Sequence, residues 1–451
     1  MLLTAVRLKD PLATMRAIPQ RWGQFERALA LIAGAALVLR ALYTLVIAPN
    51  LAGPGDFYFY HWSANLIADG RGYIDPVGLA FQGVSQPTAI HPPLWSFVLS
   101  VVSFFGGSGE PVGHLSGHDF VAHRLTGGVC GTATVILLGY LGRRVGGTRV
   151  GLVAAGAAAL YPVLIMTDGS LLSESLYGAL ITSTLLLSYR LVERPTRWRA
   201  LVLGAALGFA ALTREESLLL VILLFVPLAG FPARWFKRRA SPRLIGIACL
   251  GTALVVLPWS IRNWVAFGQP VLVSTGAGAV VAGANCQRTY AGKFIGFWDI
   301  TCIPPRGKGN EADYTGRWQD KGLRYARQHV GRLFVVGVVR VLRTWGLYQT
   351  TDDPGQPSQP LAVAFYLVLL PFAIGGAVLL KRGRDPLLML LAPMLLVTMT
   401  SLVGYGTTRF RAAAEPSLLV LAAVAMVYVW EHRKAIASWG QRARPVLGPP
   451  Q

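Results

Sequence analysis

The chain has 451 residues, of which 53% are hydrophobic and only 14% are charged. Soluble globular domains carry about 25% charged residues, so the composition excludes an ordinary soluble enzyme. The net charge is +21, but the basic residues stand between apolar runs and not along one face. This pattern argues against nucleic-acid binding and indicates a membrane protein that follows the positive-inside rule.

Ten apolar runs have the length and composition of membrane-spanning helices. They are residues 27–48, 121–141, 150–167, 172–191, 200–213, 216–231, 244–261, 361–380, 386–403 and 414–431. The first run is long enough to stay in the membrane, so we expect no cleavable signal peptide. Two further stretches are ambiguous, because 93–105 is short and 333–347 carries Arg340 and Arg343 in its middle. We expect both arginines to snorkel to the interface and not to bind substrate.

Positive charge resolves the ambiguity. With ten spans, every cluster of arginine and lysine falls on the cytoplasmic side, together with both termini. We therefore expect 93–105 and 333–347 to lie in the outer interface, whereas a bundle of up to twelve spans results if both of them cross. The prediction is an all-α polytopic protein with a cytoplasmic N-terminus (1–26), a transmembrane domain (27–431) with external loops 49–120 and 262–360, and a cytoplasmic tail (432–451).

Ionisable residues gather at the outer turns of this arrangement. They are Asp56, Arg124, Asp168, Glu174, Arg214, Arg262, Arg409 and Arg411. Charged groups at membrane depth are costly and tend to mark function, so we expect a cavity that opens outward near the headgroups. Arginines suit a lipid phosphate, and a carboxylate can take a proton from an acceptor hydroxyl. The pattern indicates transfer from a lipid-phosphate donor, but a flippase or transporter of lipid-linked sugars or anionic lipids would use many of the same groups.

Structural roles are open for the same residues. Asp56 follows a Gly-Pro-Gly run and can simply cap a helix or turn. Asp168 and Glu174 can pair with Arg214 to hold helices together. Proline, glycine and charge patterns do not decide between these roles and substrate binding.

Histidines and cysteines give weaker signals. His61 and His91 can be ligands or proton carriers, although loop histidines often have neither role. Cys286 and Cys302 share one polar loop, and a disulfide between them depends on whether that loop faces an oxidising compartment. The sequence has no zinc-site spacing, P-loop or GxSxG motif.

Four segments in order along the chain carry a family resemblance. They are Gly55-Asp56-Phe57-Tyr58; His91-Pro92-Pro93-Leu94 with His123-Arg124-Leu125; Leu257-Pro258-Trp259-Ser260-Ile261-Arg262-Asn263-Trp264; and Thr408-Arg409-Phe410-Arg411 with Glu415-Pro416. The chain resembles the GT-C superfamily of integral-membrane glycosyltransferases, in particular the bacterial branch akin to protein O-mannosyltransferases and the aminoarabinose transferase of lipid A (glycosyltransferase family 39 type). The family's fold has two interfacial helices in the first external loop, which agrees with the placement of 93–105.

The resemblance implies an inverting transferase of cell-envelope biogenesis in a bacterial inner membrane. It would move a sugar from a polyprenyl-phosphate-linked donor to a glycan, lipid or protein hydroxyl at the outer face, with Asp56 as the general base. The donor phosphate would be held by Arg262, Arg409, Arg124, Arg214 and His91, although several relatives have lysine at the position of His91. We place the substrate and acceptor pocket at Tyr58, His61, Asp168, Glu174, Asn263 and Asn285.

Some properties stay open at this point. No cofactor is implied with certainty, because some relatives use a divalent cation but no clear ligand set is spelled out here. Mannose and arabinose donors are the first to try, on family analogy alone. We expect no separate acceptor-binding module after the last span, and the loop with Cys286 and Cys302 would take over that role.

Overall fold

The computed structural model describes residues 22–51, 55–107, 112–113, 118–230, 241–348, 360–382 and 387–442. These residues form helices and loops without a named strand, and one isolated bridge joins Ile74 to Pro87. The predicted all-α architecture is confirmed. The first 21 residues, the basic turn 231–240 and the tail beyond 442 lie outside the described residues, so the parts of the predicted termini that they hold are not tested.

Each of the ten predicted spans contains helix. In chain order these are α2 (Trp22–Leu42) continued by η1 (Tyr43–Ile47), α6 (His118–Gly146), α7 (Thr148–Leu160) with α8 (Pro162–Gly169), α9 (Glu174–Glu193), α10 (Arg197–Thr213), η2 (Glu215–Leu218) with η3 (Val221–Phe225) and α11 (Val226–Gly230), α12 (Pro242–Phe267), α16 (Pro360–Arg382), α17 (Leu388–Val403) and α18 (Glu415–Arg442). Five helices of the described chain are long and apolar enough to cross a membrane, or six if α7 and α8 make one span. The count of ten therefore stays a prediction.

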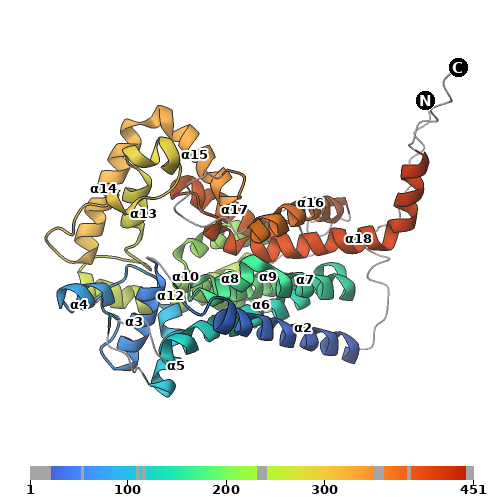
Figure 1. Ribbon diagram of the computed structural model, residues 1–451, viewed down its shortest axis with the longest axis horizontal. Helices are drawn as coiled ribbons and strands as arrows, with labels where there is room; N and C mark the ends of the chain where they lie inside the picture. Colours follow the sequence, from blue (N-terminus) through green and yellow to red (C-terminus); the bar gives the residue numbers. More distant parts are fainter. Residues whose placement is uncertain are drawn as a thin grey trace.

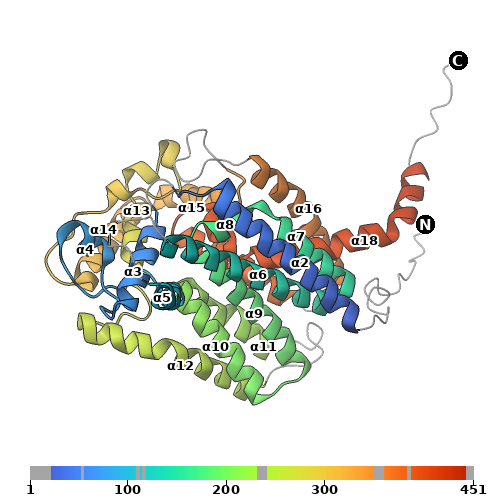
Figure 2. The ribbon, with the colours of Figure 1, turned by 60° about the horizontal axis from the view of Figure 1, so that its bottom comes forward.

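The predicted external loops fold into shorter helices at one end of the bundle (Figure 1). The first loop holds α3 (Phe57–Ala68), α4 (Pro76–Gln82) and α5 (Leu94–Gly106), and the second holds α13 (Ala277–Ala284), η4 (Gln287–Thr289), η5 (Gly292–Phe294), η6 (Ile300–Cys302), α14 (Glu311–Gln328) and α15 (Val330–Thr344). In Figure 2, α5 is seen end-on while α6 and α12 run along the page. The helix predicted at 93–105 thus lies across the direction of the long helices.

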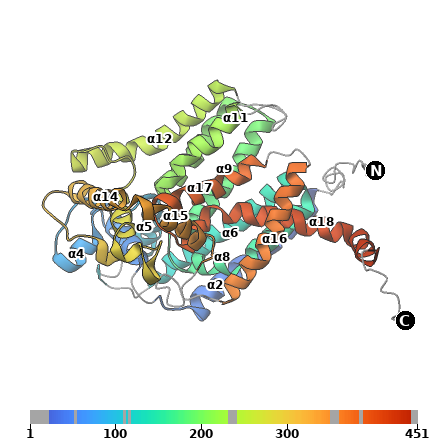
Figure 3. The same ribbon diagram turned by 90° about the horizontal axis from the view of Figure 1, so that it is seen from above.

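Small residues allow the long helices to pack closely. A methyl group added at Gly204 of α10 would come within 1.8 Å of the Ala248 carbonyl oxygen of α12, and one at Gly251 within 2.4 Å of the Leu201 oxygen. Such close backbone approach is typical of helix pairs in membranes. Figure 3 shows α12 and α2 on opposite sides of the bundle, so these contacts fix one flank of it.

Basic turns meet at the other end of the bundle. Arg143, near the end of α6, pairs with Glu26 of α2 at 2.9 Å, and Arg149 of α7 pairs with Glu431 of α18 at 2.6 Å. These four residues belong to the first turns of α2, the end of α6, the first turn of α7 and the second half of α18. The predicted cytoplasmic charges therefore gather opposite the helices of the external loops.

A sharp bend separates α7 from α8. The two helices differ in direction by 55°, and Pro162 occupies the first turn of α8, where its ring has no amide hydrogen to lose from the helix. The bend brings Asp168 of α8 to the buried Arg40 of α2, with 2.7 Å between Oδ2 and Nε. The chain continues through α8 toward the end that holds the external loops, where α9 begins (Figure 1).

Candidate active site

Asp56 stands immediately before α3, at the N-cap position. Its side chain makes no capping hydrogen bond. The capping role that the sequence left open for Asp56 is therefore absent. Instead Oδ2 accepts a hydrogen bond from Nη1 of Arg409 at 2.6 Å. Arg409 belongs to η7 (Thr408–Ala413), 353 residues further along the chain.

Arg409 also binds a second carboxylate. Its Nε donates to Oε1 of Glu174, the first residue of α9, and its Nη2 donates to Oε2 at 3.4 Å. Glu174 accepts in addition from Nη1 of Arg214 at 2.7 Å. Arg214 completes its contacts with Glu216, at 2.6 Å from Nε. We call these five residues the charged cluster; it joins the beginning of α3, the beginning of α9, the turn after α10 and η7.

The members of the charged cluster differ in exposure. The side chain of Glu174 is 1% exposed, whereas those of Asp56 and Arg409 are 35% and 24% exposed. The buried carboxylate of Glu174 therefore holds Arg214 and Arg409 in place. Asp56 is the carboxylate of the charged cluster that is most accessible to a substrate.

Charge sets the protonation of Asp56. Burial alone would raise its pKa, but the guanidinium of Arg409, with help from His91 and Arg214, holds the pKa well below its usual range. Asp56 is therefore ionised at neutral pH. One of its oxygens, Oδ2, is occupied by Arg409, which leaves Oδ1 as the oxygen that can accept a proton.

His91 faces that oxygen. Its Nε2 lies 3.8 Å from Oδ1 of Asp56, beyond hydrogen-bond distance. The ring packs edge-on against Phe59 at 4.7 Å between centroids, and its backbone carbonyl accepts from the Tyr73 hydroxyl at 3.0 Å. Burial, reinforced by Arg409, lowers the pKa of His91 although Asp56 opposes this, so the ring is neutral at pH 7.

Two arginines predicted to hold the donor phosphate bind backbone carbonyls. Arg262 of α12 donates to the Thr88 carbonyl at 2.8 Å and to the Tyr73 carbonyl at 2.6 Å, which ties α12 to the first external loop. Arg124 of α6 is fully buried, and its three contacts go to the carbonyls of Ala48, Pro49 and Gly169. The structure thus brings Arg214, Arg409 and His91 to Asp56, and gives Arg124 and Arg262 contacts with carbonyl oxygens of loops.

Three residues of the predicted pocket contact protein groups outside the charged cluster. Asp168 pairs with Arg40, not with Arg214. His61 is fully buried and shares a short contact of 2.9 Å with Nδ1 of His123. Tyr58 stacks on the neighbouring Phe57 with 4.3 Å between ring centroids.

The two predicted asparagines also contact the protein's own backbone. Asn263 donates to the Val271 and Val273 carbonyls at 3.3 and 3.2 Å, within its own α12 loop. Asn285 accepts from Arg340 at 3.0 Å and donates to the Val281 carbonyl at 2.9 Å. Asn263 and Asn285 therefore stabilise the protein's own loops and helices.

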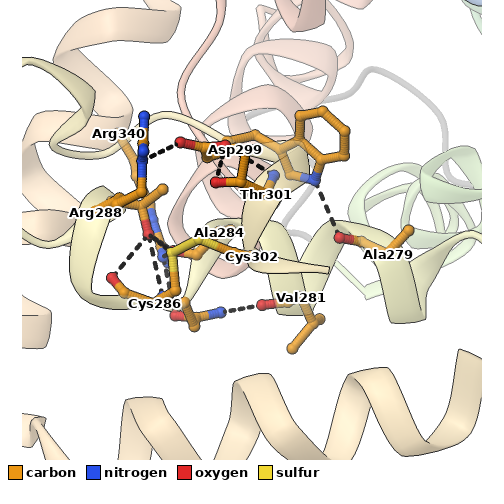
Figure 4. The surroundings of a disulfide bond; sticks show 12 residues. Ala279, Val281, Ala284, Cys286, Arg288, Asp299, Thr301, Cys302 and Arg340 are labelled. Atoms are coloured by element: carbon orange, nitrogen blue, oxygen red, sulfur yellow. Dashed lines mark hydrogen bonds and ion pairs between the residues drawn. A yellow bond between two sulfur atoms is a disulfide. The ribbon is translucent and has the colours of Figure 1, made fainter. Parts of the chain in front are cut away.

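The second external loop is closed by a disulfide between Cys286 and Cys302, with 6.2 Å between their Cα atoms. Figure 4 shows the bond beside Arg340 and the pair of Arg288 with Asp299. Arg340 is 1% exposed and donates to the Ala284 carbonyl at 2.6 Å. The expectation that Arg340 and Arg343 snorkel is wrong: both are buried, and both donate to backbone carbonyls of the protein, although Nε of Arg340 has no partner in the described part of the chain.

Sequence reasoning missed two residues of this region. Tyr405 packs on Phe410 with 4.6 Å between centroids, next to Arg409. Glu215 accepts from the Ser274 hydroxyl at 2.8 Å, and burial raises its pKa to about 7. The sequence does contain two local signals, the glycines on either side of Tyr405 and the acidic pair Glu215-Glu216 after Arg214. Neither signal predicts which residues the side chains contact. In the described part of the chain, no group of three or more His, Cys, Asp or Glu residues is placed to hold a metal ion.

Residues 110–260 match the family model described as dolichyl-phosphate-mannose-protein mannosyltransferase. Glu174 and Arg214 fall inside this match, whereas Asp56 and Arg409 fall outside it. No curated protein matches the chain in sequence.

Solved structures extend the likeness to nearly the whole chain. The oligosaccharyltransferase of Archaeoglobus fulgidus, tethered with an acceptor peptide, is 15% identical and aligns with a TM-score of 0.57 over 95% of this chain and 52% of its own. The chain has the GT-C fold. A second structure of that archaeal enzyme, AglB in complex with an inhibitory peptide and a dolichol-phosphate, aligns with a TM-score of 0.51 at 14% identity over 96% of this chain and 53% of its own.

The chain spans about half the length of these oligosaccharyltransferases. ArnT from Cupriavidus metallidurans bound to undecaprenyl phosphate also aligns, at 14% identity and a TM-score of 0.42, over 94% of this chain and 81% of its own. At these identities, the two oligosaccharyltransferase structures define the fold of the chain and leave its substrates to be argued from its own residues.

Proposed function

We propose that the chain is a glycosyltransferase that moves a sugar from a polyprenyl-phosphate-linked donor to an acceptor hydroxyl, with inversion at the anomeric carbon. The observation that carries the proposal is the charged cluster, in which an ionised, partly exposed carboxylate and two arginines meet at the loop end of a GT-C bundle. The family model, named for a dolichyl-phosphate-linked donor, supports the same class of substrate, and so does the dolichol-phosphate held by AglB.

In the proposed reaction, Oδ1 of Asp56 takes the proton of the acceptor hydroxyl. The acceptor oxygen then bonds to the anomeric carbon, while the bond from that carbon to the phosphate oxygen breaks on the opposite face. The departing polyprenyl phosphate gains a second negative charge, which Arg409 and Arg214 are placed to stabilise because guanidinium groups fork onto phosphate oxygens. The leaving group needs no proton, since phosphate leaves readily as an anion.

Two observations support an outer-face location in a bacterial inner membrane. Disulfides persist in oxidising compartments, and the Cys286–Cys302 bond lies in the loop whose Gly296 carbonyl accepts from the Gly406 amide, three residues before Arg409. The basic turns meet at the opposite end of the bundle, as the positive-inside rule requires of a cytoplasmic face. Both observations support our proposal that the charged cluster lies on the non-cytoplasmic side.

Transport of lipid-linked sugars is the alternative that the sequence left open, and it needs charge along a path through the bundle. Arg40, about halfway along the first predicted span, is the residue that such a path would use. It is 1% exposed and occupied by Asp168 and by the carbonyls of Ala36 and Ala158. This arrangement favours a transferase.

Release of free polyprenyl phosphate tests the proposal. Purified protein in lipid nanodiscs would be incubated with radiolabelled polyprenyl-phosphate mannose and polyprenyl-phosphate arabinose, with a peptide or membrane-lipid acceptor. A transferase releases polyprenyl phosphate and labels the acceptor, and the Asp56→Asn variant does neither. Asp69→Asn, an exposed carboxylate just after the same helix, is the matched control. Movement of intact donor between leaflets without release would instead support a transporter.

A further inference from the structure

Four aromatic side chains meet next to the charged cluster. Tyr405 lies 4.6 Å from Phe410, 5.9 Å from Phe297 and 6.2 Å from Trp298, measured between ring centroids. We call these four residues the aromatic cluster. Two of them come from the segment between α17 and α18 and two from the disulfide-closed loop, so residues more than a hundred positions apart converge here.

Backbone contacts fix the position of Tyr405. The amide of Gly406 donates to the Gly296 carbonyl at 2.8 Å, and a methyl group at Gly406 would come within 2.3 Å of the Arg340 carbonyl oxygen. The indole of Trp298 donates to the Ala279 carbonyl at 3.0 Å. A main-chain hydrogen bond and close backbone packing therefore hold the two halves of the aromatic cluster together, in addition to their ring contacts.

The aromatic cluster continues directly into the charged cluster. The guanidinium of Arg214 lies 5.3 Å from the centroid of the Phe410 ring, and Arg409 is the residue before Phe410. Contacts thus run without a break from Tyr405 through Phe410 to the two arginines and on to Asp56. A phosphate on these arginines would therefore lie next to Phe410, which in turn contacts Tyr405.

Tyr405 is not fully buried in the protein core. Its side chain is half-buried, and among the described residues its hydroxyl has no hydrogen-bond partner. The hydroxyls of Tyr161 and Tyr366 are buried without a partner within the described ranges, but that of Tyr405 is not enclosed in the protein. It is therefore accessible to a ligand that brings its own polar groups.

We propose that the aromatic cluster is the subsite for the sugar ring of the lipid-linked donor, with Tyr405 as its main contact. A sugar is joined to its phosphate by one bridging oxygen, so a phosphate on Arg409 and Arg214 puts the ring against Tyr405 and Phe410. The axial C–H groups of a sugar carry partial positive charge and suit the negative face of an aromatic ring. The Tyr405 hydroxyl can exchange hydrogen bonds with a ring hydroxyl. This inference rests on the proposed function, because it assumes a donor phosphate on the arginines.

The test compares three lipids: two that carry different sugars and one that carries none. Affinities of nanodisc-embedded protein for polyprenyl-phosphate mannose, polyprenyl-phosphate arabinose and bare polyprenyl phosphate would be measured for the wild type, Tyr405→Ala and Tyr405→Phe. We expect Tyr405→Ala to weaken binding of the preferred sugar-bearing lipid about tenfold, the worth of one good aromatic contact, and to leave bare polyprenyl phosphate unchanged. Tyr405→Phe keeps the ring and should lose about threefold, the worth of one modest hydrogen bond.

A matched control guards against a folding effect. Tyr325→Ala removes a ring of the same size from α14, where Tyr325 stacks on His329 with 4.0 Å between centroids, and should change neither affinity. Equal losses for both kinds of lipid, no loss for either, or a change confined to the acceptor KM would overturn the subsite while leaving the transferase intact. A wild type that binds neither lipid and releases no polyprenyl phosphate would overturn both proposals.

Discussion

Replacing Asp56 by Asn separates chemistry from binding. The change keeps the shape of the side chain but removes the proton acceptor, and general-base catalysis contributes about 10²–10⁴-fold to rate. We expect kcat to fall by that factor. The pH profile of the wild type should show no inflection from Asp56 above pH 5, because Arg409 holds the pKa of this carboxyl below its usual range. Proton uptake by Asp56 then abolishes activity only in stronger acid.

Donor affinity should move in the opposite direction. Oδ2 of Asp56 lies 2.6 Å from Arg409, and two unit charges about 4 Å apart attract by about 1 kcal/mol in water and about 4 kcal/mol at an effective dielectric constant of about 20. Asp56 is 35% exposed, so solvent screening puts the value in the lower half of that range. Asp56 and the donor phosphate compete for Arg409, and the Asn side chain competes less because it carries no charge. Bare polyprenyl phosphate should therefore bind about tenfold tighter to the Asp56→Asn variant.

Single-turnover release of polyprenyl phosphate and a separate titration with bare polyprenyl phosphate measure the two effects. Asp56→Glu is the companion variant, because it keeps the charge and moves it by one methylene. If Asp56→Asn retained more than a tenth of the wild-type kcat, Asp56 would not be the base. If its affinity for polyprenyl phosphate fell, Asp56 would belong to the phosphate site and not compete with it.

Three further predictions concern groups around the site. Burial raises the pKa of Glu215 from 4.5 to about 7, so the folded state holds a proton that the unfolded chain releases. Raising the pH from 5 to 8 therefore lowers the thermal stability of the protein. Glu215→Gln should reduce this loss of thermal stability. Burial lowers the pKa of His61 from 6.5 to about 4, so the wild type loses stability as the pH falls through this range. His61→Gln should reduce that loss without changing the KM of the acceptor, and a raised acceptor KM would return His61 to the acceptor pocket. Replacing both Cys286 and Cys302 by Ser opens a loop with a sequence separation of 16, which should cost about 3 kcal/mol and weaken binding of the sugar-bearing lipid; unchanged sugar binding would show that the aromatic cluster does not depend on the bond.

Local sequence signals predicted the helices well. Apolar runs of about 20 residues gave helices at each of the ten predicted positions, and α5 occupies residues 94–106 where the charge pattern required a non-spanning helix. The break inside the third predicted span was missed. Its cause, Pro162 in the middle of an apolar run, is visible in the sequence, but hydropathy does not register a change of direction.

The partners of the arginines were not predictable in the same way. Arg262 and Arg409 both stand in family-like motifs at the outer end of the bundle, yet one binds two backbone carbonyls and the other binds two carboxylates. A guanidinium group accepts either environment. Whether an arginine contacts carbonyls or carboxylates depends on loops up to 353 residues away along the chain. Local sequence patterns do not predict the path of those loops.

The pairing inside the charged cluster affects the surrounding membrane as well as the donor. Three carboxylates, Asp56, Glu174 and Glu216, face two arginines, so the site offers no surplus positive charge. An anionic phospholipid headgroup would have to displace a carboxylate and would gain little in return, whereas a donor that also places a sugar against Tyr405 gains a second contact. Selectivity against the bulk lipid then arises without a gate, and a large excess of phosphatidylglycerol should leave the rate of transfer unchanged.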